Sequence, residues 1–375
     1  MADITPITMP KWGLTMTEGK VLGWLKGEGE TFGAGEELLE IETSKITNAF
    51  EAGEPGILRR IVATPGTTLP IGGLMAVAAP ENVPDAEIDA FIAGYAAPEL
   101  ETTAAEESVA TAPRDIEAGG KRIRVLDLSD GPGVPVMFVH GFGADLNAWM
   151  FNQPALAESR RALAFDLPGH GGSTKTLDQA VDAASFAADL DRLLQALGIE
   201  RLHLVGHSMG GAIALAFAAW QPARVASLTL IAPAGLGPEI NRDFIDGFTR
   251  AQRRREMQEV LALLVHDPAL VSRQMVEDVL RYKRLDGVAA ALEALAAAWF
   301  PNGSQRENQA AAIPALKMPV QIIWGGDDRI IPAAHGRAFA GDLPVHIIEQ
   351  TGHLPHMEKS GDVNRLIGRF LDQLP

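Results

Sequence analysis

The feature that most constrains the fold is an acidic stretch that divides the chain into two unequal parts. Residues 81–115 are rich in Ala, Pro, Glu and Thr and contain nine acidic side chains and one basic one, half of the chain's net charge of −16. Such a composition buries too little apolar surface to form a core. We therefore expect an acidic linker over 80–118, with a short helix around Asp85–Tyr95, between a domain at 1–79 and a larger one at 119–375.

The composition excludes several classes of function. The chain has no cysteine, so it lacks disulfides, thiolate catalysis and zinc–thiolate sites of its own, and we expect no metal site. The start, "MADITPITMPKWG", shows no signal-peptide pattern, and no apolar run approaches membrane-spanning length. We expect a cytoplasmic protein with no membrane partner. The net negative charge argues against binding to nucleic acid.

Residues 1–79 have the pattern of a small all-β domain, with short apolar runs separated by glycine and no helical periodicity. Leu39 and Ile41 alternate with glutamates, and the alternation resumes from Ile46, which predicts a hairpin around Lys45. The tip has neither the Asn-Gly nor the lone Gly that tight hairpins favour. A lysine at such a tip is a candidate attachment point.

The sequence "MPKWGLTMTEGKVLGWLKGEGETFGAGEELLEIETSKI", together with "EAGEPGILRRI" and "PGTTLPIGGLMAVA", resembles the lipoyl domains of 2-oxo acid dehydrogenase complexes over nearly all of 1–79. The resemblance implies lipoic acid in amide linkage on Lys45. Ser44 replaces the aspartate usual in that family, and the methionines that flank the lysine of the related biotin carriers are absent. The amide removes the ammonium charge, and a long arm on a rigid tip presents an acyl thioester at high effective concentration. A solvated turn lysine is the alternative.

From residue 120 onward, apolar strand runs alternate with amphipathic helical segments, which predicts a mostly parallel sheet covered by helices on both faces. The strongest signal is "GHSMG" at 206–210, between the apolar run Leu202–Val205 and an Ala-rich helix at Gly211–Trp220. A serine at a sharp strand-to-helix turn needs small neighbours because its backbone is strained, and the helix N-terminus favours developing negative charge. This context makes Ser208 the candidate nucleophile.

A serine nucleophile requires an imidazole to take its proton and a carboxylate to orient that imidazole. Asp328 follows the strand run that ends in "QIIWGG", and His353 follows "VHIIEQTG", so the order is Ser, Asp, His. Asp327 and His356 are the adjacent alternatives.

Two backbone N–H groups should face the oxyanion of the intermediate, those of Met209 and of Phe142 in "HGFG". We interpret His140 as a structural member of that loop. His170, His203 and His207 are interpreted as packing or loop residues.

Across 120–375 the segments "VHGFG", "FDLPGHGGS", "GHSMGG", "WGGDDRIIP" and "GHLPH" resemble an α/β-hydrolase, in family order. The expected fold is thus multidomain, a lipoyl domain followed by an α/β-hydrolase domain. The helical insert at 235–305 corresponds to the family's cap, which governs substrate choice. We expect the cap to be basic in an otherwise acidic protein, and therefore expect Arg253, Arg254 and Arg255 to help hold the phosphates of coenzyme A; a solvated helix face is the alternative.

The two parts together resemble the dihydrolipoamide acetyltransferase component of bacterial acetoin dehydrogenase complexes. The resemblance implies transfer of an acetyl group from a lipoyl thioester on Lys45 to coenzyme A, through Ser208. It also implies two partners, a thiamine diphosphate-dependent component that cleaves acetoin and a dihydrolipoamide dehydrogenase. The His-x-x-x-Asp-Gly motif of the usual acyltransferase domain is absent, and so is a convincing subunit-binding domain. The alternatives are a lipoyl-linked thioesterase that releases acid to water, and a carrier whose hydrolase-like domain is an inactive scaffold.

Overall fold

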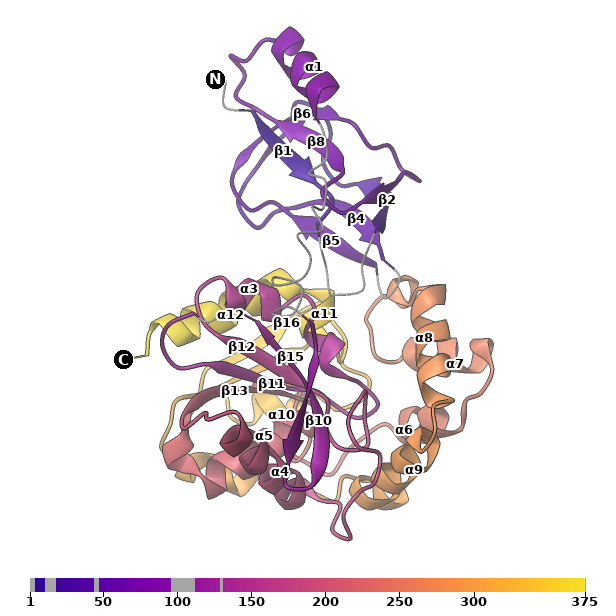
Figure 1. Cartoon of the computed structure of the whole chain (residues 1–375), viewed down its shortest axis with the longest axis vertical. Coiled ribbons are helices and arrows are strands. Elements are labelled where there is room, and N and C mark those ends of the chain that lie inside the picture. The colour runs from indigo at the N-terminus through magenta and orange to yellow at the C-terminus, as the bar shows by residue number, and fades with distance from the viewer. Residues whose placement is uncertain (1–3, 11–17, 44–46, 96–111, 129–130, 375) are drawn as a thin grey trace. The chain divides into compact units, whose positions relative to one another are not determined.

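The computed structural model describes residues 4–10, 18–43, 47–95, 112–128 and 131–374. The chain forms two compact units, an N-terminal unit and a larger C-terminal unit (Figure 1). Among the described residues, no helix is long and apolar enough to cross a membrane.

The N-terminal unit is built from two four-stranded antiparallel sheets, which confirms the predicted small all-β domain. One sheet has the order β1 (Thr5–Thr8), β8 (Leu74–Ala78), β6 (Gly56–Ile61), β3 (Thr31–Phe32). The other has the order β5 (Thr47–Glu51), β4 (Glu37–Glu42), β2 (Glu18–Trp24), β7 (Thr68–Pro70). Val21, Ile41, Leu58 and Met75 are fully buried in one core to which both sheets contribute.

The hairpin predicted around Lys45 is present in its two arms. β4 pairs with β5 in antiparallel register, with Leu39 opposite Phe50 and Glu42 opposite Thr47. Leu39 and Ile41 are fully buried, as the alternation predicted. Lys45 itself lies outside the described residues.

The short helix expected in the linker is α1 (Asp85–Gly94), and it packs on the N-terminal unit. Ile88 is fully buried in a cluster with Leu74 and Val77 of β8. The Tyr95 hydroxyl donates to the carbonyl of Gly72 at 2.9 Å. The first unit therefore extends well beyond residue 79, because apolar side chains on α1 cover a face of β8 despite the acidic composition around them.

The C-terminal unit has an eight-stranded sheet in the order β16 (Val345–Ile348), β15 (Val320–Gly325), β14 (Val225–Ile231), β13 (Leu202–His207), β11 (Val136–Val139), β12 (Ala162–Phe165), β10 (Lys121–Leu128), β9 (Arg114–Ala118). The strands from β16 to β12 are parallel, and β10 is antiparallel to both of its neighbours. The parallel strands β11 to β15 are buried throughout, as expected of a sheet covered on both faces.

Helices cover both faces of this sheet. Figure 1 shows α4 (Ala183–Ala196) and α5 (Met209–Trp220) on one face, and α3 (Gln153–Ala157), α11 (Pro355–Glu358) and α12 (Ser360–Asp372) on the other. A short helix, α10 (Ala334–Arg337), contacts β15. This is the layered arrangement that the alternating pattern predicted.

The predicted linker ends too late in the sequence. Arg114–Ala118 forms β9, which pairs with β10 as an edge strand, with Ile116 opposite Ile123. An edge strand exposes one side of its backbone and carries polar side chains, so its "RDIEA" sequence resembles the acidic stretch before it. The C-terminal unit thus begins before residue 119.

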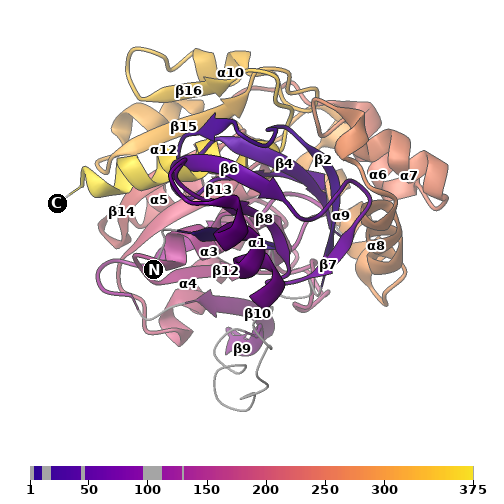
Figure 2. The ribbon, with the colours of Figure 1, turned by 90° about the horizontal axis from the view of Figure 1, so that it is seen from above.

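Four helices lie between β14 and β15 in the sequence, within the predicted cap at 235–305. They are α6 (Arg242–Arg250), α7 (Arg254–Leu261), α8 (Arg273–Lys283) and α9 (Val288–Trp299). They gather together at one side of the sheet in both views (Figures 1 and 2).

Candidate active site

Ser208 lies in the turn between β13 and α5, with φ 52° and ψ −119°. A non-glycine residue with positive φ is strained, and such strain is typical of a serine presented at this kind of turn. Its backbone is held on both sides: the Ser208 N–H donates to Ile231 O at 3.0 Å, and its carbonyl accepts from Gly211 N and Ala234 N, each at 2.9 Å. The strained geometry is therefore stabilised by hydrogen bonds to α5 and to the chain after β14.

The glycines on either side of Ser208 are required by close backbone contacts. A Cβ atom at Gly206 would lie 2.5 Å from the carbonyl oxygen of Gly210, and one at Gly210 would overlap the carbonyl of Val139. A Cβ at Gly141 would lie 3.0 Å from that of Ser208. The loop after β11 thus passes directly beside Ser208.

His353 and Asp328 form a buried pair at the ends of neighbouring strands. His353 Nδ1 donates to Asp328 Oδ2 at 2.7 Å, and both side chains are almost inaccessible. Trp324 Nε1 donates to the same oxygen at 2.9 Å, and the N–H groups of Ile330 and Ile331 donate to Oδ1 at 2.8 and 3.0 Å. The carboxylate is fixed by four donors, which places the histidine proton on Nδ1 and leaves Nε2 as a base.

The alternative carboxylate and base have other partners and environments. Asp327 is half exposed and its Oδ2 lies 2.9 Å from His266 Nδ1. His356 is fully buried, its ring packs between Trp149 and His207, and burial lowers its pKa to about 3. Neither side chain joins the pair of His353 and Asp328.

His207, the neighbour of Ser208 in the sequence, contacts His353 and so brings Ser208 and His353 into one region. His207 Nε2 donates to the His353 carbonyl at 2.8 Å, and the two rings lie 4.8 Å apart. No hydrogen bond joins Ser208 Oγ to His353 in the part of the chain that the structure describes. Catalytic hydrogen bonds often shorten only when substrate binds.

The loop after β11 is held by two buried histidines. His140 Nδ1 donates to Gly141 O at 2.8 Å while its Nε2 accepts from Leu167 N at 3.0 Å. His170 Nε2 accepts from Gly143 N at 3.1 Å. Burial lowers the pKa of both rings, that of His140 to about 4, so they are neutral and can accept these bonds.

The backbone N–H groups of Phe142 and Met209 make no hydrogen bond among the described residues. Both therefore remain available as donors beside Ser208.

Burial shifts the pKa of several titratable groups in this unit toward their neutral forms. Burial lowers the pKa of five histidines: His140, His170, His203, His207 and His356. Burial raises the pKa of Asp166 to about 7, although its carboxyl group accepts from Leu146 N at 2.7 Å and Gly172 N at 2.5 Å. Of these groups, His140, His170 and Asp166 accept hydrogen bonds from backbone N–H groups of the loops after β11 and β12.

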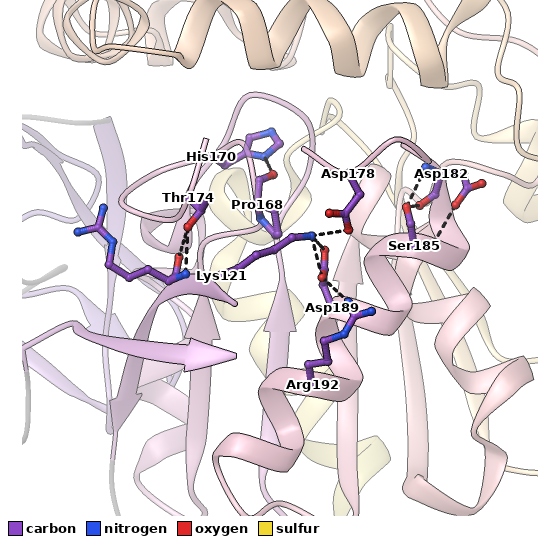
Figure 3. A network of polar contacts seen from close by, with 10 residues as sticks. Lys121, Pro168, His170, Thr174, Asp178, Asp182, Ser185, Asp189 and Arg192 are labelled. Atoms are coloured by element: carbon purple, nitrogen blue, oxygen red, sulfur yellow. Dashed lines mark hydrogen bonds and ion pairs between the residues drawn. The ribbon is translucent and has the colours of Figure 1, made fainter. Parts of the chain in front are cut away.

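A polar network fixes β10 against α4 and is shown in Figure 3. Lys121 Nζ lies 2.7 Å from both Asp178 and Asp189, and Arg192 pairs with Asp189 at 2.8 Å. Each cation in this network has a carboxylate partner, so we assign it a structural role.

The cap covers the loop after β11 with aromatic rings. Phe142 packs edge-on against Phe248 of α6 and against Phe300, with centroids 5.7 and 5.9 Å apart. Lys283 of α8 donates to the carbonyls of Phe248 and Ala251, which fixes the end of α6. An apolar wall therefore lies next to the free N–H of Phe142.

One group of site contacts escaped the sequence analysis, a clamp formed by cap residues 262–267. His353 N donates to Leu264 O at 2.7 Å, and Arg329 donates to Val265 O at 2.6 Å. Glu358 accepts from Gly352 N at 2.9 Å and from His266 N at 2.7 Å, and burial raises its pKa. The cap thus holds both loops that carry Asp328 and His353.

The three arginines selected from the sequence lie around the start of α7. Arg253 and Arg255 are largely exposed, and Arg255 pairs with Glu259 at 3.1 Å. Arg254 pairs with Glu277 of α8 at 2.8 Å. Among the described residues, no group of three His, Asp or Glu side chains could hold a metal ion.

Two family models match this chain. Residues 134–360 match the alpha/beta hydrolase fold family, and residues 5–77 match the biotin and lipoyl family described as biotin-requiring enzyme. Among solved structures, a meta-cleavage product hydrolase from Pseudomonas fluorescens superposes with a TM-score of 0.63 at 24% identity, over 71% of this chain and 99% of that one. That likeness supports the fold of the C-terminal unit.

Two relatives of known name match nearly the whole chain, and a third matches 69% of it. The dihydrolipoyllysine-residue acetyltransferase component of the acetoin cleaving system of Pseudomonas putida is 44% identical over 99% of both chains. The protein of the same name from Cupriavidus necator is 44% identical over 98% of this chain and 97% of its own. A 2-hydroxymuconate semialdehyde hydrolase from a Pseudomonas species is 33% identical over 69% of this chain and 93% of its own.

Proposed function

Because this chain belongs to the family of dihydrolipoyllysine-residue acetyltransferase components of acetoin-cleaving systems, we propose that it transfers an acetyl group from a lipoyl thioester to coenzyme A. The observation that carries the proposal is the buried pair of His353 and Asp328, linked at 2.7 Å, beside the strained turn of Ser208. A lipoyl domain in the same chain supplies the acyl group locally.

We assign the lipoyl attachment to Lys45. Lipoic acid in amide linkage supplies a dithiol that carries the acetyl group as a thioester. The residues around the attachment point fit this role, since β4 and β5 pair up to Glu42 and Thr47 and so form a rigid hairpin on both sides of the lysine in the sequence. A primary amine is the group that forms such an amide.

In the first half of the reaction, Ser208 Oγ attacks the acetyl carbonyl while His353 Nε2 takes its proton. The N–H groups of Phe142 and Met209 stabilise the oxyanion that forms. The C–S bond then breaks, His353 gives the proton to the departing sulfur, and the acetyl group is left as an ester on Ser208. Asp328 holds the imidazole in the required tautomer and stabilises its charged form.

In the second half, His353 takes the proton of the coenzyme A thiol, and the sulfur attacks the ester on Ser208. The C–S bond forms, the C–Oγ bond breaks, and the proton returns to Ser208. Ping-pong kinetics follow from this order. As partners we propose a thiamine diphosphate-dependent acetoin-cleaving component and a dihydrolipoamide dehydrogenase, because the relatives are components of acetoin-cleaving systems.

Water is the competing acceptor, because the C-terminal unit also resembles a hydrolase at 33% identity. The test is to load the lipoylated protein with acetyl groups and to incubate it with and without coenzyme A. We expect acetyl-CoA to form stoichiometrically and little acetate to appear without coenzyme A. Release of acetate at the same rate in both samples would show a thioesterase instead.

A further inference from the structure

A pocket of about 600 Å³ lies in the cap between the start of α7 and the face of α8. Its lining residues come from these two helices and the chain next to them: Gln252, Arg253, Arg254, Glu277, Leu280, Arg281 and Arg284. Four of the seven are arginines and one is a glutamate, in a chain whose net charge is −16. Two of these arginines, Arg281 on α8 and Arg284 just after it, were not among the residues predicted from the sequence.

The positive charge belongs to this pocket and not to the cap as a whole. Residues 235–305 contain nine Arg and Lys against ten Asp and Glu, so the expectation that the cap is basic is wrong. The pocket collects arginines because α7 and α8 bring together residues about thirty positions apart. Three of its arginines are paired, Arg253 with Glu256, Arg254 with Glu277 and Arg281 with Asp278.

Arg284 is the unpaired cation of the pocket. In the described part of the chain its side chain has no hydrogen bond and no ion pair. Leu280, which is nearly buried, adds an apolar wall next to it. The combination of an unpaired guanidinium, further arginines and an apolar wall suits a ligand that has both phosphate groups and a flat base.

The pocket is continuous in the chain with the wall of the active site. Gln252 and Arg253 follow closely after Phe248, whose ring packs on Phe142. Five residues span at most about 18 Å, which bounds the distance from Phe248 to Arg253. Lys283, the neighbour of Arg284, donates to the carbonyl of Phe248. A ligand held here needs a long flexible arm to reach Ser208.

We propose that this arginine pocket binds the phosphate groups of coenzyme A and so directs its thiol toward Ser208. The inference rests on the proposed transfer to coenzyme A. Guanidinium groups bind phosphate in a bidentate manner, and Leu280 contacts the adenine. The pantetheine arm bridges the interval between the pocket and the reacting ester.

The test compares Arg284→Gln and Arg281→Gln with a matched control, Arg255→Gln. Arg255 lies on the same cap helix as Arg254, is largely exposed and does not line the pocket. Adenosine 3′,5′-bisphosphate is titrated into the full-length protein by calorimetry, and the KM for coenzyme A is measured beside it. We expect each pocket variant to weaken bisphosphate binding and to raise KM by about tenfold, with kcat retained, because each loses a charge-assisted hydrogen bond. Binding to the parent protein should weaken with added salt.

Equal bisphosphate affinity in the parent and both pocket variants, or an equal loss in Arg255→Gln, overturns the proposal. The outcome is separate from that of the proposed function. Acetyl-CoA formation with an unchanged KM in Arg284→Gln refutes the pocket and leaves acetyl transfer in place. Arginine-dependent bisphosphate binding without acetyl-CoA formation supports the pocket and refutes the transfer.

Discussion

Replacing Asp328 by asparagine tests the role proposed for the pair of Asp328 and His353. The carboxylate accepts four N–H donors, two at each oxygen. An amide offers one oxygen and one NH2 group, so two of these donors must face the NH2 group. If it replaces Oδ1, the N–H groups of Ile330 and Ile331 both lose their acceptor, at a cost of about 1–3 kcal/mol each.

The other orientation is less costly. If the NH2 group replaces Oδ2, it faces Trp324, which keeps a second acceptor at Ile331 O at 3.2 Å. It also faces His353 Nδ1, which can accept a hydrogen bond if the imidazole moves its proton to Nε2. The asparagine therefore selects the wrong tautomer, and His353 can no longer take the proton of Ser208.

We expect Asp328→Asn to lower kcat on the order of 10⁴-fold, which corresponds to about 5.5 kcal/mol in the barrier. Stability to urea should fall by only about 1–3 kcal/mol. The assay follows acetyl-CoA formed from free S-acetyldihydrolipoamide. Asp327→Asn is the control, because an exposed pair with His266 contributes about 0–1 kcal/mol and does not touch His353. An Asp328→Asn variant within about tenfold of the parent, or an equal loss in Asp327→Asn, would refute the reasoning.

Three further predictions follow from the structure. We expect intact mass to show a single lipoyl adduct in the parent and none in Lys45→Arg, and an adduct that persists in the variant would contradict the assignment. Glu358→Gln should lower kcat on the order of tenfold with little change in the KM for coenzyme A. The glutamine NH2 group would face a backbone N–H that the Glu358 carboxylate accepts, and this repulsion would disturb the clamp on His353. An unchanged kcat in steady-state kinetics would show that the clamp does not contribute to catalysis. Stability to urea should fall as the pH decreases from 6.5 toward 4, because the five buried histidines have lowered pKa values and the unfolded chain therefore binds more protons in this range. Each contributes up to about 1.4 kcal/mol per pH unit, and the raised pKa values of Asp166 and Glu358 offset part of this sum. Constant stability from pH 7 to 4 would contradict the prediction.

Local signals in the sequence predicted most of the fold. The alternation of Leu39 and Ile41 predicted a hairpin that the structure confirms in its arms. The glycines beside Ser208 predicted a sharp turn, and the positive φ of Ser208 has that form. In both cases the structure depends on interactions between residues that are close in the sequence, so the sequence pattern predicts it.

Contacts between distant residues could not be predicted in the same way. Glu358 and His266 are 92 positions apart, and nothing in their spacing signals the clamp on His353. The cap arginines illustrate the same limit. The run of three basic residues predicted a role for Arg255, which does not line the pocket, whereas Arg284, just after α8, does line it. Composition also misled at the linker, because α1 and β9 carry acidic sequences yet pack on the two units.

The most direct test of the account is to trap the acetyl ester on Ser208. The protein is loaded with acetyl groups without coenzyme A, quenched in acid and digested for mass spectrometry, and the rate of acetyl-CoA formation by Ser208→Ala is measured in parallel. We expect an acetyl group on the peptide that contains Ser208, its disappearance when coenzyme A is added, and a loss of several orders of magnitude in the variant, which keeps its lipoyl group and fold. An unmodified Ser208 together with substantial transfer by Ser208→Ala would show direct transfer between thiols and contradict the account.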